Sequence, residues 1–149
     1  MMGMLPVRIH RLAPHVALPE YQTPGAAGFD LAASEEVSVQ PGGVALVPTG
    51  LVVETPRGYF LGIFARSSTP LKRGLMVANG VGVVDSDYCG ERDEVKVAVL
   101  NFTNAPVHLK VGDRIAQGLF IPVARAEWQE TAGDLREGSR GGFGATGER

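Results

Sequence analysis

The sequence predicts a single all-β domain of short strands, of the sandwich, jelly-roll or barrel type. Three observations predict it. Twenty glycines and ten prolines interrupt the chain, at intervals of roughly 8 to 12 residues, and runs rich in Val, Leu, Ile and Phe lie between them. No stretch keeps the 3.6-residue hydrophobic period of a long helix. At 149 residues with 44% hydrophobic content, the chain has the length of one domain and can build one core.

The apolar runs between these breaks place nine strands. They are expected at residues 7–12, 29–33, 36–39, 44–54, 59–65, 75–77, 94–101, 107–109 and 114–123. In the run that begins at Glu94, Val95, Val97 and Val99 alternate with polar or small residues, which is the period of a half-buried strand. One short helical turn is expected at 69–73.

The composition changes near the C-terminus. From Thr131 the sequence reads TAGDLREGSRGGFGATGER, in which Leu135 and Phe143 are the large apolar residues. Such a segment cannot build a core, so we divide the chain into a β domain at 1–136 and a flexible arm at 137–149. The arm is either a frayed tail or a lid in which Arg140 holds a phosphate and Phe143 covers a base.

Charge and composition exclude several classes of protein. A net charge of −2 with 20% charged residues indicates neither disorder nor electrostatic capture of nucleic acid. The opening MMGMLPVRIHRL contains no apolar run long enough for a signal peptide or a membrane span. The single cysteine, Cys89, excludes an internal disulfide and fits the cytoplasm, and the three histidines lack metal-ligand spacing.

The segment NGVGVVDSDY, residues 79–88, carries a candidate ligand site. Its glycines allow a tight hairpin whose backbone groups, with the Asn79 amide, can read the edge of a small planar ligand. Asp85 or Asp87 can serve as a general base for a water molecule, and Tyr88 can stack on a sugar. Both acids point to the same side if the backbone stays extended, unless the turn redirects one. An ordinary hairpin with a core tyrosine remains the alternative.

Three further segments carry polar groups suited to phosphate or metal. ARSSTPLKRG, residues 65–74, combines Arg66 with Ser67 and Ser68, whose backbone N–H groups can form an anion-binding concavity. A basic surface loop is the alternative, because the segment is not a Walker A loop. GAAGFDLAA, residues 25–33, places Asp30 at the start of a strand, where it can hold Mg²⁺ through water. RIAQG, residues 114–118, places Gln117 in a strand, and an amide at the edge of the core explains it equally well.

Taken together with RGGFGATG at 140–147, these segments resemble the trimeric deoxyuridine triphosphate pyrophosphatases (dUTPases) in order and over nearly the whole chain. The resemblance implies a distorted jelly roll, the β-clip of that family, assembled as a homotrimer with active sites shared between subunits. It also implies Mg²⁺-assisted hydrolysis of dUTP to dUMP and pyrophosphate, in which an Asp-oriented water attacks the α-phosphate. This activity limits uracil incorporation into DNA and supplies dUMP.

The resemblance assigns a role to each matching residue. Asp85 orients the attacking water and contacts the 3'-hydroxyl of the deoxyribose, while Asp87 has a turn role. Tyr88 packs beneath the sugar, where a ribose 2'-hydroxyl has no room. The remaining contacts divide by substrate group. Asn79, Gly82, Val83 and Val84 read uracil, while Arg66, Ser67, Ser68 and Gln117 contact phosphates or water. Lys96 is a further substrate contact, Arg140 and Phe143 close the site, and Asp30 is a magnesium partner through water.

Three departures from the family pattern bear on these assignments. Ser68 stands where the family usually has glycine. The stretch from Gly90 to Val95 is about two residues longer than usual, which moves the contact on the next strand to Lys96. The arm arginine usually precedes the phenylalanine by five residues, but that position is Gly138 here. Arg140 is therefore the predicted phosphate contact, with Arg136 as the second candidate.

Other functions use parts of the same pattern. A non-catalytic regulatory trimer that senses dUTP would not need the water-orienting Asp85, and a purely structural jelly roll would not need the phosphate and base contacts together. The related deoxycytidine triphosphate deaminases attack the base, whereas the uracil hairpin and the terminal RGGFGATG favour hydrolysis at phosphate.

Overall fold

The computed structural model describes residues 3–144 and 147. Within them the chain forms eleven strands and one short helix. The strands are β1 (Arg8–Arg11), β2 (Phe29–Ala32), β3 (Val37–Val39), β4 (Val44–Pro48), β5 (Leu51–Glu54), β6 (Tyr59–Phe64), β7 (Leu75–Val77), β8 (Gly82–Val84), β9 (Lys96–Asn101), β10 (Val107–Leu109) and β11 (Arg114–Pro122), and the helix is α1 (Ser68–Arg73). In the described part of the chain, no helix has the length and apolar content needed to cross a membrane.

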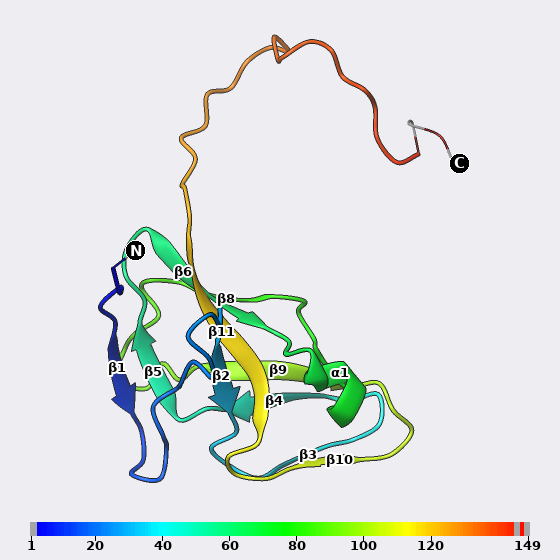
Figure 1. The fold of residues 1–149 in the computed structure, drawn as a ribbon. Helices are drawn as coiled ribbons and strands as arrows, with labels where there is room; N and C mark the ends of the chain where they lie inside the picture. Colours follow the sequence, from blue (N-terminus) through cyan, green and yellow to red (C-terminus); the bar gives the residue numbers. More distant parts are fainter. Residues whose placement is uncertain (1–2, 145–146, 148–149) are drawn as a thin grey trace.

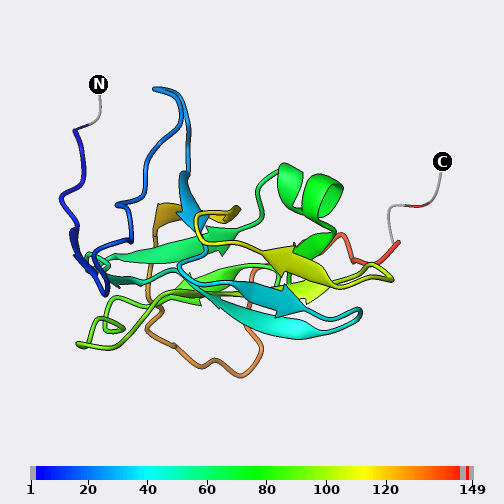
Figure 2. The ribbon, with the colours of Figure 1, turned by 90° about the horizontal axis from the view of Figure 1, so that it is seen from below.

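The strands pair into four antiparallel sheets that wrap one core (Figures 1 and 2). The largest sheet has the order β2-β11-β6-β8, a second has the order β4-β9-β7, and the pairs β1-β5 and β3-β10 complete the fold. Neighbours in a sheet lie far apart in sequence, as in β11 with β2 and β9 with β4. The all-β, distorted jelly-roll prediction is confirmed.

The core lies between these sheets and follows the alternation read from the sequence. In β9, Val97 and Val99 are fully buried, while Lys96 points to solvent. Leu61 of β6 and Ile115 of β11 are also fully buried. Burying a side chain of this size stabilises the fold by about 1.5–3 kcal/mol.

The predicted strand at 44–54 is two strands that belong to different sheets. β4 pairs with β9, whereas β5 pairs with β1. The chain turns between them at Gly50, whose φ of 71° lies in the left-handed region. A Cβ at this position would lie 2.5 Å from Cγ2 of Val16, so both the backbone conformation and the close packing require glycine. The unbroken run of apolar residues concealed this turn.

One strand was not predicted. β8 occupies Gly82–Val84 within the hairpin segment and pairs with β6. A Cβ on Gly82 would lie 2.9 Å from Cβ of Ile63, so the missing side chain is what lets β8 approach β6. Glycine has a low strand propensity, so the local sequence did not indicate a strand here. Packing against β6 determines that this strand forms.

The C-terminal segment leaves the body of the molecule after β11 (Figure 1). The described residues from 123 onward form no helix or strand and are exposed. The boundary between domain and arm at 136/137 stays a prediction, because residues 123–136 have the same irregular, exposed character as 137–144. The end of the predicted arm, at 145–146 and 148–149, lies outside the described residues.

The outer face of the β4-β9-β7 sheet is apolar. Val44 and Leu46 of β4 are 64% and 61% exposed, and Met76 of β7 is 50% exposed. Phe102, directly after β9, is also 50% exposed. Exposed apolar patches are a feature of surfaces that contact other proteins, membranes or ligands.

Candidate active site

A pocket of about 390 Å³, which we call the base pocket after its predicted ligand, lies along the hairpin of residues 79–88. β8 is the edge strand of its sheet in the described part of the chain, so the backbone N–H and C=O groups on its outer side have no strand partner. These groups lie beside the pocket and can bind a ligand edge. The lining residues are Leu46, Ile63, Asn79, Gly82, Val83, Val84, Asp85, Tyr88, Glu94, Val95 and Lys96. The structure therefore brings together the predicted base and sugar contacts, the predicted general base and Lys96.

The turn after β8 separates the two acids. The N–H of Tyr88 donates to the carbonyl of Asp85 (3.2 Å), which closes the turn. Asp85 lines the pocket, but Asp87 lines a different hollow, together with Cys89. The expectation that both acids share a side holds only for an extended backbone, and the turn redirects Asp87. Of these two acids, Asp85 is the one that remains beside the pocket.

Tyr88 lines this pocket and is 41% exposed, so it is not a core residue. Its hydroxyl donates to the backbone carbonyl of Glu94 (3.0 Å). The ring is thus fixed at its far end by a hydrogen bond and stays accessible to a ligand. Glu94 was not singled out from the sequence, because a contact through its backbone carbonyl leaves no mark on the residue type.

The predicted phosphate loop lies at the end of β6. The N–H of Arg66 donates to Oγ1 of Thr69 (2.9 Å), and that hydroxyl donates to the carbonyl of Ile115 (3.0 Å). Because Thr69 is buried, these bonds fix the loop against β11. Ser67 is the N-cap residue of α1 but makes no side-chain capping bond, and the hydroxyl of Ser68 accepts from Nη1 of Arg66 (3.3 Å). Ser68 therefore lies beside the guanidinium group of Arg66.

Asp30 holds two arginines at this loop. Its Oδ1 lies 2.9 Å from Nε of Arg66, and its Oδ2 lies 3.1 Å from Nη1 of Arg114. The carboxylate side chain is only 13% exposed. Gln117, paired with Asp30 across the β11–β2 ladder, donates from Nε2 to the carbonyl of Ala65 (3.0 Å), directly before Arg66. Asp30 and Gln117 thus set the position of Arg66 from two sides.

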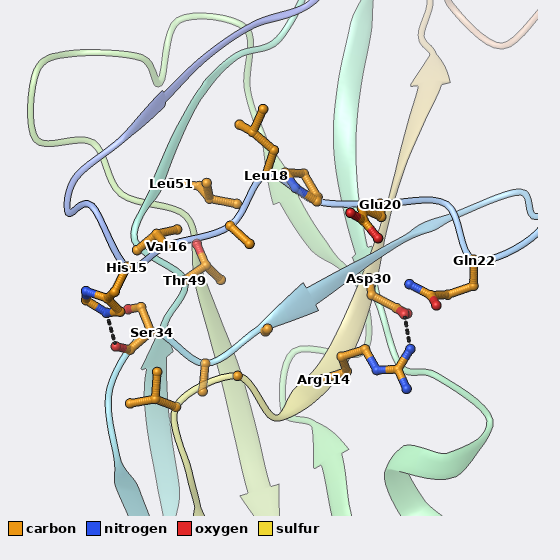
Figure 3. Close-up of a pocket in the computed structure, with 16 residues that line it drawn as sticks. His15, Val16, Leu18, Glu20, Gln22, Asp30, Ser34, Thr49, Leu51 and Arg114 are labelled. Atoms are coloured by element: carbon orange, nitrogen blue, oxygen red, sulfur yellow. Dashed lines mark hydrogen bonds and ion pairs between the residues drawn. The ribbon is translucent and has the colours of Figure 1, made fainter.

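Figure 3 shows Asp30 and Arg114 pointing toward one another from β2 and β11 at one end of a second pocket, of about 280 Å³. At its other end a ring nitrogen of His15 lies 2.9 Å from the carbonyl oxygen of Ser34. Among the predicted site residues, only Asp30 lines this pocket. Arg114 contacts the predicted site residue Asp30 but was not singled out from the sequence, because the two lie 84 positions apart and no local pattern connects them.

The donor set fits a magnesium ion that arrives with its ligand. Within residues 3–144 and 147, no group of three or more His, Cys, Asp or Glu side chains is arranged to hold a metal. Mg²⁺ commonly takes one or two carboxylates, several waters and the phosphates of its substrate. Since both oxygens of Asp30 form ion pairs with arginines, this carboxylate fits contact through water better than direct ligation.

The phosphate loop does not line the base pocket of the same chain. The lining includes Ile63, three residues before Arg66, but none of the predicted phosphate contacts Arg66, Ser67, Ser68 and Gln117. The predicted arm contacts do not reach the pocket either: Arg140 and Phe143 are exposed, and neither lines it. A single chain therefore holds the parts of the site without assembling them.

An ion pair outside the pocket ties β1 to β5. Nη2 of Arg8 donates to Oε1 of Glu54 (2.8 Å), and Nε of Arg8 donates to the other oxygen. This hydrogen bonding lowers the pKa of Glu54 below its ordinary value and raises the pKa of Arg8. Both side chains lie at the surface, so the pair is screened by solvent and salt.

A family model, a curated relative and a solved structure that are similar to this chain are all dUTPases. The family model of the dUTPases matches residues 14–147. The deoxyuridine 5'-triphosphate nucleotidohydrolase of Desulfitobacterium hafniense (strain DSM 10664 / DCB-2) is 50% identical over 135 residues, which cover 87% of each chain. The crystal structure of the dUTPase from Streptococcus mutans has a TM-score of 0.75 at 33% identity, covering 82% of this chain and 98% of that one.

A more distant structure shares the fold. It is a point mutant of the dUTPase from phage phi11 of S. aureus, described for its coordination of a structural Mg(II) ion. It has a TM-score of 0.78 at 20% identity and covers 87% of this chain and 99% of that one.

Proposed function

Because this chain belongs to the dUTPase family, we propose that it hydrolyses dUTP to dUMP and pyrophosphate. The observation that carries the proposal is the pocket of residues 79–96, in which the outer edge of β8, the ring of Tyr88 and the carboxylate of Asp85 meet. Each has one task in this reaction. The strand edge reads the base, the ring selects the sugar, and the carboxylate prepares the water.

Uracil is proposed to bind along β8. A planar base with alternating donors and acceptors matches the outer backbone groups of Gly82, Val83 and Val84, and the Asn79 amide adds a donor and an acceptor. Tyr88 then lies beneath the deoxyribose. Its ring is fixed by the hydrogen bond to the carbonyl of Glu94, so it would clash with a 2'-hydroxyl and could not easily move aside.

Asp85 is proposed to act as the general base. Its carboxylate accepts a proton from a water molecule, whose oxygen forms a new bond to the α-phosphorus. The bond from the α-phosphorus to the bridging oxygen breaks, and pyrophosphate leaves with that electron pair. No protein nucleophile is required, because in-line placement of the water and neutralisation of the phosphate charge supply most of the rate enhancement.

The phosphate chain is proposed to lie against Arg66, Ser67 and Ser68, with Gln117 as a further contact. Lys96, which lines the base pocket, is proposed as a substrate contact there. Mg²⁺ is the proposed cofactor: carried on the triphosphate, it would neutralise charge on the phosphate oxygens. Asp30 would contact it through water. The guanidinium groups held by Asp30 supply fixed positive charge on the same side.

A homotrimer with shared sites is proposed from two features. Arg66, Ser67 and Ser68 do not line the base pocket of their own chain, so a second copy can complete each site. The apolar outer face of the β4-β9-β7 sheet, which includes Val44, Leu46 and Met76, offers a surface for that copy. The arm at 137–149 would then close over a site with Arg140 near the terminal phosphates and Phe143 over the base.

A cytoplasmic location stays a prediction. It rests on the nucleotide substrate and on the single free cysteine, Cys89, which fits a reducing compartment.

The proposal is tested by incubating the purified protein with each deoxynucleoside triphosphate and with UTP in the presence of Mg²⁺, and separating the products. We expect dUMP and pyrophosphate from dUTP and little turnover of the others. Deamination of dCTP would indicate the related deaminase chemistry. Tight binding of dUTP without product, by a protein shown to be folded and trimeric, would indicate the sensing role instead.

A further inference from the structure

The orientation of Tyr88 depends on one distant contact. The ring is 41% exposed, so packing alone does not fix it. Its hydroxyl donates to the carbonyl oxygen of Glu94 (3.0 Å), six residues later in the chain. Whatever fixes the peptide of Glu94 therefore fixes the ring.

That peptide is fastened to the turn between β4 and β5. Oε2 of Glu94 accepts a hydrogen bond from the N–H of Gly50 (2.7 Å). The next residue adds three bonds: Val95 donates its N–H to the carbonyl of Leu51 (2.8 Å), and its own carbonyl accepts from both the N–H and the hydroxyl of Thr49. Thr49 and Val95 are buried, so this junction belongs to the rigid body of the domain.

The carboxylate of Glu94 is the acceptor for the N–H of Gly50, which is buried and adopts a left-handed φ of 71°. A buried N–H without an acceptor is strongly disfavoured. Loss of the carboxylate would therefore turn the Gly50 N–H toward a new acceptor or toward water. That movement would shift the neighbouring Thr49 and Leu51, whose hydrogen bonds to Val95 hold the peptide that carries the Glu94 carbonyl. The hydroxyl of Tyr88 would move with that peptide.

The residues between Tyr88 and Glu94 form a loop closed on itself. The N–H of Gly90 donates to Oδ2 of Asp93 (2.8 Å), and the N–H of Asp93 donates to the carbonyl of Gly90 (3.0 Å). The loop's connection to the β4–β5 turn is made by Glu94 and Val95, and Glu94 also lines the base pocket. The loop thus links a fixed turn to the tyrosine.

We propose that Glu94 is a positioning residue for sugar selection: its carboxylate, bound to Gly50, holds the carbonyl that holds Tyr88 against the deoxyribose. The proposal rests on the proposed dUTPase function and adds a residue to it. Glu94 does not touch the reacting atoms, so its effect is on the discrimination between dUTP and UTP and on KM, with little effect on the chemical step.

The test compares kcat/KM for dUTP and for UTP in the parent protein and in Glu94→Ala, Glu94→Gln and Glu91→Ala. Glu94→Ala is expected to lower the dUTP/UTP ratio roughly tenfold, the scale of a loosened steric contact, with kcat for dUTP nearly unchanged. Glu94→Gln is expected to keep the ratio, because its amide oxygen can accept from Gly50. Glu91→Ala removes the same charge from an exposed position of the same loop and is expected to change nothing.

A double-mutant cycle separates positioning from general structural support. Tyr88→Phe lacks the hydroxyl, so it is expected to lose selectivity to the same level as Glu94→Ala, and adding Glu94→Ala to it should lower the ratio no further. An unchanged ratio in Glu94→Ala, additive losses in the cycle, or an unchanged ratio in Tyr88→Phe would each overturn the proposal. The last comparison decides the matter even if Glu94→Ala does not fold. Failure of the function itself would appear first in the parent protein, as absence of dUTP hydrolysis.

Discussion

Replacing Asp30 by asparagine tests whether this carboxylate organises the phosphate loop. In the folded protein its Oδ1 forms an ion pair with Nε of Arg66 at 2.9 Å, its Oδ2 accepts from Nη1 of Arg114 at 3.1 Å, and its side chain is 13% exposed. The asparagine side chain would have the same shape but no charge, and its amide nitrogen would face one of the two guanidinium groups. Two cations would then share a site with a single neutral acceptor.

The cost follows from these two contacts. A hydrogen bond to a charged group contributes about 1.5–3 kcal/mol, but the side chain of Arg114 is 48% exposed, so solvent screens its share. For Asp30→Asn we expect a net loss of about 2–3 kcal/mol in the free energy of unfolding, on the same scale. For a chain of this size that lowers Tm by about 5–10 °C. Displacement of Arg66 should also lower kcat/KM for dUTP by roughly 100-fold, the penalty of a misplaced positioning group.

Thermal unfolding and steady-state kinetics measure both effects. Glu54→Gln is the matched control, since it removes a carboxylate from an exposed pair with Arg8 and should change Tm by little. If Asp30→Asn unfolds within about 1 °C of the parent, the change expected for an exposed pair, and retains full activity, Asp30 does not organise the loop and the reasoning is refuted.

Three further predictions concern the water, the arm and pH. Asp85→Asn should keep the fold and dUTP binding but lower kcat by roughly 10²–10⁴, the contribution of a general base; unchanged turnover would remove Asp85 from that role. Truncation after Arg136 should leave Tm nearly unchanged and reduce turnover severely. Arg140→Ala should reproduce much of this loss, whereas Arg136→Ala should not. A larger defect in Arg136→Ala would show that Arg136, and not Arg140, contacts the phosphates. The pKa of Glu54, measured by carboxyl NMR titration, should lie below its ordinary value because Arg8 donates hydrogen bonds to the carboxylate. The pair therefore stabilises the fold at pH above that ordinary value, and the stabilisation is lost as the pH falls through the lowered pKa. Arg8→Gln should return the pKa of Glu54 to its ordinary value, and an unshifted pKa in the parent would contradict the pairing.

The strands were predictable wherever local pattern and packing agree. Val97 and Val99 alternate with exposed or half-exposed residues in the sequence, and both are buried in β9. The pattern failed at Gly50, where an unbroken apolar run conceals a turn that assigns its halves to two sheets, and at Gly82, where a residue that disfavours strands is required by the approach of β8 to Ile63. Both failures arise from contacts with residues distant in sequence.

The same distinction applies to the site. The motif at 79–88 predicted the pocket around Asp85 because its residues are contiguous, and the structure brings them together with Lys96. Arg114 and Glu94 were missed. Arg114 contacts Asp30, 84 positions away in the sequence, and Glu94 contacts Tyr88 through a backbone carbonyl that any residue possesses. The arm contacts remain predictions from the family resemblance, because the single chain leaves Phe143 fully exposed.

The central claim is that water attacks the α-phosphorus of dUTP in the pocket of Asp85. Hydrolysis in water enriched in ¹⁸O, followed by mass spectrometry of both products, tests it most directly. We expect one ¹⁸O atom in the phosphate of dUMP, unlabelled pyrophosphate, and a much slower appearance of this label in Asp85→Asn. Label found in pyrophosphate, or no dUMP from the folded protein, would contradict this mechanism.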